Sequence, residues 1–447
     1  MGLLDGLLFL VLLVWTYIPN RYIPFWEVGT VLIKATDVGV FVIFAACLIA
    51  LVLKRCRTYE YTGRLAAVRY LGLLTFLYAA ITMTWSQKEF RDQLAMGYTL
   101  LCAITCILSA LFIVDRQVTR LVRLLWCLSV FLAVAGVCYW LQAVFDLGFR
   151  AVNYVELDQF GTQRLGGPLV NPARGQFMFV PALGFVVGQL LSRNISKKTG
   201  VPVAMGLLVS LFGLGARSAL VCLAVFVLML AVSLRRSNRT MAIILVVVFS
   251  AGAGSLVFLR SKTERLSTFD PGRLMTYETS TAMFLDQSPL EHVFGAGYGR
   301  WWPWYRTDVE GGGAWFTHRF VQMTPYGPTL FNPHSTFIIA VIELGLPGSL
   351  AFAFLLLLLI RTAWRCRHLS PNVGVFATGV AATIPAFFSD CYLVSDVKQN
   401  LIWWLFVGGA VALQRAEEFR LEQNYRASYG RELYANCIYQ EGRLRVP

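Results

Sequence analysis

Charged residues are scarce in this chain of 447 residues. Only 14% of the residues are Asp, Glu, Lys or Arg and 57% are hydrophobic, whereas about 25% of an average soluble domain is charged. This balance excludes an ordinary soluble globular protein. It predicts an all-α polytopic integral membrane protein, in which the bilayer takes the place of a large soluble core.

Features of metal-bound, disulfide-linked or secreted proteins are missing as well. The chain has four histidines, and its ten cysteines include none within residues 260–333. No Cys/His spacing typical of zinc occurs, so we expect neither a metal site nor a disulfide framework. The first twenty residues lack a basic start and a small-residue cleavage site, so we expect a retained first span.

What the sequence does contain is a series of apolar runs. Because a span takes about 20 apolar residues, we predict about twelve transmembrane helices, some tilted, broken or re-entrant. The runs lie near residues 3–19, 38–53, 65–85, 94–114, 122–145, 175–191, 201–214, 218–234, 240–259, 335–360, 373–390 and 399–414. This gives helices 1–9 within residues 1–259, helices 10–12 within 334–414, and a tail at 415–447.

The positive charges separate these runs, which argues against a nucleic-acid partner for a chain of net charge +14. Lys and Arg gather in alternate connections, at residues 54–64, 116–123, 193–198, 235–239 and 361–367. The positive-inside rule places these connections, both termini and the tail in the cytoplasm. Residues 260–333 then form one long loop on the opposite side, and their length suggests an ordered functional segment with short helices, one starting at Pro271.

His334 stands directly before an apolar run of about 25 residues, in "FNPHSTFIIAVIELGLPG". One interpretation is a capping or snorkelling residue. The other is a catalytic base, because ionisable groups at membrane depth are rare and usually functional. The N-terminus of a helix disfavours an imidazolium and would keep the ring ready to accept a proton.

Two arginines flank a glycine-rich stretch before another apolar run. Arg164 and Arg174 lie in "FGTQRLGGPLVNPARGQFMFV", which also holds Asn171. Glycines let the backbone approach a bulky headgroup, and guanidinium groups match phosphate oxygens. The pattern predicts a phosphate-binding segment.

Arg217 interrupts an otherwise apolar stretch, "LFGLGARSALVCLAVF", and Arg273 lies near the start of the expected loop helix. An anionic ligand is a natural partner for Arg217, although a turn residue in contact with water or lipid phosphate has the same sequence signature. For Arg273 a salt bridge to Asp270 or Glu278 is the alternative. Together with His334, these arginines suggest a site for a bulky anion attacked by a hydroxyl.

The aromatic segment "GAGYGRWWPWYR" follows no strand and does not match a nucleotide-binding fingerprint. Its tryptophans, among them Trp301 and Trp302, are expected in an interfacial aromatic belt, with sugar stacking as the alternative. We take four residues as substrate-pocket candidates: Trp301, Trp302, Asn171 and Asn332.

Four of these segments together resemble the bacterial O-antigen ligase and O-antigen polymerase superfamily. They are "RLGGPLVNPARGQFM", "GARSALV", "GRLMTYETSTAMFLDQSPLEHVFGAGYG" and "NPHSTFIIAVIELGLPG". In the last segment, Ser335 occupies the position where that superfamily commonly has asparagine. The motifs cover residues 160–350, and the resemblance in topology covers the whole chain.

The resemblance implies a GT-C-like glycosyltransferase that needs no metal or other cofactor and uses a glycan linked to undecaprenyl diphosphate. Arg164, Arg217 and Arg273 would clamp the diphosphate, with Arg174 as an additional candidate. His334 would deprotonate the acceptor hydroxyl, which attacks the anomeric carbon with inversion.

The first expectation for the acceptor is a lipid A-core sugar, as for an O-antigen ligase facing the periplasm of a bacterial inner membrane. The alternatives are an O-antigen polymerase, a protein O-oligosaccharyltransferase and, in another functional class, a transporter of lipid-linked glycans. The singled-out charges lie at one expected face of the membrane, whereas transporters usually place charges at the midplane.

Overall fold

The computed structural model describes residues 2–16, 24–28, 31–53, 62–86, 90–145, 154–157, 163–166, 169, 174–214, 216–234, 271–302, 321–330, 333–389 and 397–443. These residues are mostly helical, and three short antiparallel hairpins interrupt the helices. The expected helix at 240–259 lies outside the described residues, as do Asn171 and Asn332.

The first part of the chain contains α1 and several longer helices. In order the elements are α1 (Leu3–Trp15), the hairpin β1 (Pro24–Val28) and β2 (Val31–Lys34), α2 (Ala35–Val52), α3 (Thr62–Thr82), η1 (Met83–Trp85), α4 (Phe90–Val114) and α5 (Val118–Phe145). After the hairpin β3 (Tyr154–Leu157) and β4 (Gln163–Gly166) come α6 (Gln176–Leu191), α7 (Lys197–Gly213) and α8 (Arg217–Leu234).

The second part supplies the expected outer segment and the last helices. Its elements are α10 (Pro271–Leu285), α11 (Pro289–Phe294), the hairpin β5 (Val321–Thr324) and β6 (Gly327–Leu330), α12 (Thr336–Ile342), α13 (Gly345–Cys366), α14 (Pro371–Ala381), η3 (Ile384–Phe388) and α16 (Val397–Arg443). The start of α10 at Pro271 matches the prediction, because proline suits the first turn of a helix. The hairpins were not predicted.

Four helical segments of the described chain are long and apolar enough to cross a membrane: Gln93–Val114, Val118–Gln142, Gly345–Cys366 and Pro371–Phe388. Five shorter apolar helices accompany them. A mostly helical chain with membrane-spanning character is therefore confirmed. The number of about twelve spans, the GT-C likeness and the orientation stay predictions.

The apolar run at 335–360 is not one helix, in contrast to the expectation. α12 ends at Ile342 and α13 begins at Gly345, which has a φ of +60°. The carbonyl oxygens of Ile342 and Glu343 accept hydrogen bonds from the backbone N–H groups of Ala296 and Gly297, 3.0 and 3.1 Å away. The loop that follows α11 therefore uses carbonyls that a continuous helix would use internally.

The core lies along α16, the last helix. All residues from 401 to 414 are buried, and this part of α16 packs against α4, α5, α6 and α14. A helix that is apolar and buried on every side occupies the centre of its bundle. The expected boundary at residue 414 is not a break, since α16 runs on without interruption to Arg443.

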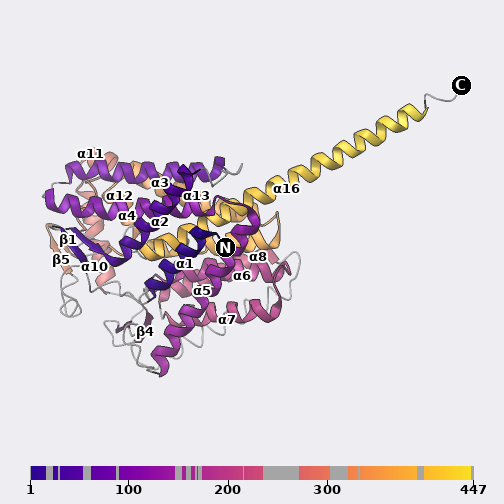
Figure 1. Ribbon diagram of the computed structural model, residues 1–447. Coiled ribbons are helices and arrows are strands. Elements are labelled where there is room, and N and C mark those ends of the chain that lie inside the picture. The colour runs from indigo at the N-terminus through magenta and orange to yellow at the C-terminus, as the bar shows by residue number, and fades with distance from the viewer. Residues whose placement is uncertain are drawn as a thin grey trace.

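The two ends of the bundle differ in structure. The hairpins β1–β2 and β5–β6 lie with α10 at one end, while the C-terminal part of α16 projects far from the opposite end (Figure 1). α6 and α14 cross closely in between, where a Cβ atom on Gly184 would lie 2.8 Å from the Cα of Gly379. Small residues at such crossings let two helix backbones approach.

Candidate functional site

Three helices that carry predicted site residues meet at the short helix η3. α8 and α12 both pack against η3, and the hydroxyl of Tyr277 on α10 donates a hydrogen bond to the carbonyl oxygen of Phe388, 3.1 Å away. Phe337, in the first turn of α12, packs its ring 5.6 Å from that of Phe388. Arg217, Arg273 and His334 therefore lie at or beside the starts of three helices that share one neighbour.

The backbone at His334 is unusual. Its φ is +46°, a left-handed conformation that costs roughly 1–2 kcal/mol for a residue with a Cβ atom. Ser335, not His334, caps α12, because its hydroxyl accepts the N–H of Ile338 at 3.3 Å. Such strain is found preferentially at active sites and ligand clamps. The capping interpretation of His334 is therefore wrong, and the residue lies half-buried just outside the helix, with its Nδ1 atom buried.

Arg174 and Arg217 are brought together by the starts of α6 and α8. The fully buried Gln176, first residue of α6, donates from Nε2 to the hydroxyl of Ser218 at 3.1 Å. Arg174 precedes this bond by two residues on one side, and Arg217 precedes it by one residue on the other. Arg217 is exposed and Arg174 is half-buried.

Arg273 lies in the first turn of α10, half-buried, and α10 also contacts α12. Arg164 lies on β4, where the antiparallel register places it opposite Glu156 of β3. β4 contacts α5 and α7 rather than η3. Arg217 and Arg273 thus lie on helices that contact η3, His334 lies directly before such a helix, and Arg164 lies on a separate hairpin.

A buried glutamate that was not predicted organises the aromatic segment. The Glu343 side chain is fully buried and accepts three backbone hydrogen bonds, from Gly299 at 3.0 Å, Trp301 at 3.0 Å and Trp302 at 3.2 Å. Three glycines with positive φ, at 295, 297 and 299, allow the loop to wrap around this carboxylate. A lone acid inside an apolar run was the available sequence signal.

The same loop binds the end of α3. The backbone N–H of Tyr298 donates to the hydroxyl of Thr82, the last residue of α3, at 3.1 Å, and the indole of Trp85 in the adjoining η1 donates to the carbonyl of Gly295 at 3.2 Å. Residues 295–302, here named the glutamate loop, therefore connect α3 to the break between α12 and α13. They fix the far end of the short helix that follows His334.

The two tryptophans of the glutamate loop differ in environment. Trp302 is fully buried, so the expectation of an interfacial belt is wrong for this residue. Trp301 is partly exposed and packs 5.6 Å from the ring of Tyr326, with the Arg300 guanidinium 5.1 Å from its centre. Trp301 keeps the surface that sugar stacking requires.

Charge–charge contacts outside the apolar helices hold the rim of this region. Glu291 completes the capping box of α11 with Ser288 and pairs with Arg300. The Ser288 N–H and the Arg300 guanidinium hold the pKa of Glu291 below its ordinary value. A hydrogen bond to Asp286 raises the pKa of Tyr326.

An apolar pocket lies beside the start of α12. It has a volume of about 100 Å³ and is lined by α3, α4, α12, α13 and α16, with Tyr298 of the glutamate loop. From α12 it takes Thr336, Ile339 and Ala340, so it begins two residues after His334. The pocket is thus close to His334 along the chain, and its lining includes none of the candidate arginines.

No group of three or more His, Cys, Asp or Glu side chains within the described ranges is placed to hold a metal ion. Comparison with known proteins adds nothing to the geometry, since no family model and no curated protein matches the chain. What the site can do is therefore argued from its residues.

Proposed function

We propose that this protein is an integral membrane glycosyltransferase of the O-antigen ligase type. Its donor would be a glycan on undecaprenyl diphosphate, and its acceptor a lipid A-core sugar hydroxyl at the periplasmic face of a bacterial inner membrane. The observation that carries the proposal is the strained His334, which precedes a helix that borders an apolar pocket and contacts α10 and η3. The motif resemblance supports the same assignment.

In the proposed reaction His334 takes the proton of the acceptor hydroxyl. The oxygen then attacks the anomeric carbon of the donor, and the bond from that carbon to the diphosphate oxygen breaks with inversion. Arg217 and Arg273 offset the negative charge that develops on the departing lipid diphosphate. The polyprenyl chain would lie in the apolar pocket, and Trp301 would stack on a sugar ring.

The decisive experiment is transfer by purified protein supplied with the lipid-linked donor and lipid A-core. His334→Asn is the sharpest variant, because asparagine tolerates a left-handed backbone but does not act as a base. Loss of a positioned base should lower transfer by about 10²–10⁴-fold. His292→Ala is the matched control, since this half-buried histidine bonds to the carbonyl of Phe284 away from α12.

Retention of full transfer by His334→Asn would contradict the proposal. Strong inhibition by EDTA, reversed by a divalent cation, would contradict the metal-independent chemistry. Offering a second lipid-linked glycan and an acceptor protein in parallel reveals whether the enzyme is instead a polymerase or a protein-modifying transferase. Unchanged transfer with blocked lipid export in the His334 and Arg217 variants would indicate a transporter.

A further inference from the structure

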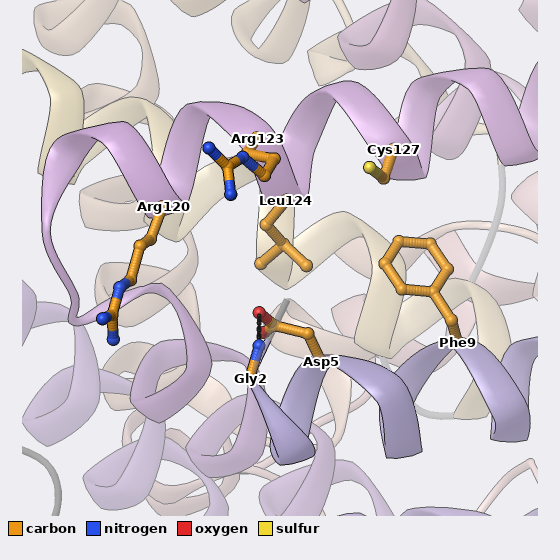
Figure 2. Close-up of a pocket in the computed structure, with 7 residues that line it drawn as sticks. All are labelled: Gly2, Asp5, Phe9, Arg120, Arg123, Leu124 and Cys127. Atoms are coloured by element: carbon orange, nitrogen blue, oxygen red, sulfur yellow. Dashed lines mark hydrogen bonds between the residues drawn. The ribbon is translucent and has the colours of Figure 1, made fainter.

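A second cavity lies far along the chain from the proposed site, between the first turns of α1 and α5. Its volume is about 220 Å³, and its described lining is Gly2, Asp5, Phe9, Arg120, Arg123, Leu124 and Cys127. Figure 2 shows Arg123 on α5 above the Asp5 side chain of α1, and Arg120 to the left of that side chain. None of these residues contributes to the glycosyl transfer proposed above.

The charges around this cavity do not cancel. The carboxylate of Asp5 accepts the Gly2 N–H at 3.1 Å and pairs with Arg116, so its negative charge is already matched. Arg120 and Arg123 are exposed, and neither takes part in an ion pair with any residue in the described ranges. Two uncompensated guanidinium groups therefore stand at the rim.

The inner part of the cavity is apolar. Leu124 and Cys127 lie one and two turns along α5 from Arg120, on the same face, because residues three and four apart are neighbours on a helix. Phe9 of α1 faces Cys127 across the cavity (Figure 2). A ligand that fills the cavity would meet positive charge at one end and hydrocarbon at the other.

The position of the cavity relative to a bilayer follows from α5. The segment Val118–Gln142 is long and apolar enough to span a membrane, so Arg120 and Arg123 lie in its first two turns. Arginines at such positions lie at the level of lipid headgroups, and the following turns enter the hydrocarbon. The order of charge and apolar surface along the cavity matches the order of phosphate and acyl chain in a phospholipid.

We propose that this cavity is a binding site for an anionic phospholipid. Arg120 and Arg123 bind the phosphate, and an acyl chain lies against Phe9, Leu124 and Cys127. The site is independent of the proposed glycosyl transfer. It makes the packing of α1 on α5 sensitive to the lipid composition of the membrane.

The test measures lipid binding to the purified full-length protein by native mass spectrometry. Dioleoylphosphatidylglycerol should bind about tenfold more tightly than dioleoylphosphatidylcholine, and Arg120→Ala/Arg123→Ala should remove this preference. Arg361→Ala/Arg365→Ala is the matched control, because it removes two exposed arginines from the end of α13. It should change the preference by less than twofold.

Two further variants separate the parts of the proposal. Arg120→Lys/Arg123→Lys keeps the charge and should retain most of the binding, which also shows that the fold survives. Cys127→Trp fills the apolar part without changing charge and should weaken phosphatidylglycerol binding. Millimolar inorganic phosphate should not displace the lipid, because it lacks the acyl chain.

The proposal is overturned if the two double-alanine variants lower phosphatidylglycerol binding equally, since the effect would then be one of net charge. It is also overturned if the protein does not distinguish the two lipids, or if inorganic phosphate displaces phosphatidylglycerol. None of these results depends on whether the protein transfers a glycan.

Discussion

Replacement of Glu343 gives the sharpest test of the structure around the proposed site. In Glu343→Gln one carboxylate oxygen becomes an amide NH₂ group, which cannot accept a hydrogen bond. If the remaining oxygen serves Trp301 and Trp302, the N–H of Gly299 faces a donor inside a buried loop. Glu343→Ala removes both carboxylate oxygens and with them all three hydrogen bonds.

The size of each effect follows from the number of bonds lost. Leaving one buried donor unsatisfied costs about 1–3 kcal/mol, and bonds to a charged acceptor contribute about 1.5–3 kcal/mol each. We expect Glu343→Gln to cost the glutamate loop about 2 kcal/mol and Glu343→Ala about 4 kcal/mol. Since 1.4 kcal/mol is a factor of ten, amide exchange in the loop should accelerate about 30-fold and about 10³-fold.

Hydrogen–deuterium exchange with mass spectrometry, on peptides that cover residues 295–302, measures this directly. Glu278→Gln is the matched control, because this exposed glutamate on α10 lies away from the loop and should leave its exchange unchanged. If Glu343→Ala leaves the loop amides as protected as in the parent protein, the carboxylate is not what holds the loop. The assignment of Glu343 as its anchor would then be rejected.

Two further predictions concern packing and pH. Gly184→Leu should lower the free energy of unfolding by about 1–3 kcal/mol, because the α14 backbone leaves no room for a side chain. Thermal unfolding measures this effect. Gly6→Leu is the control and should change the stability little, because a Cβ atom at Gly6 has no neighbour within 4 Å. Glu291 has a lowered pKa, so its bonds to Ser288 and Arg300 stabilise the protein fully above its ordinary value of 4.5 and progressively less as pH falls below it. The difference in Tm between the parent protein and Glu291→Gln should therefore be positive at pH 6 and shrink by pH 3. A difference that stays constant over this range would show that the charge of Glu291 is not involved.

Long local patterns predicted much of the helical structure. α4 and α5 lie within a few residues of the apolar runs at 94–114 and 122–145, because an uninterrupted apolar run determines a helix without help from distant residues. α8 and α10 begin at or next to the arginine and proline that the sequence singled out. These features depend on neighbours in the chain.

Features that depend on distant residues were not predictable in this way. The break after Ile342 exists because backbone N–H groups of residues 296 and 297 reach its carbonyl and that of Glu343. The role of η3 as the shared neighbour of α8, α10 and α12 likewise needs contacts between segments that are far apart in the sequence. A single sequence shows which residues are unusual, but not which of them meet.

The central place of α16 bears on how the protein is made. Ribosomes release this helix after the other described helices, yet its residues 401–414 are all buried. We therefore expect the earlier helices to pack more loosely, with lipid between them, until α16 inserts. A chain that stops before residue 397 would lack its innermost helix. We expect membrane quality-control proteases to degrade it as an incompletely folded protein.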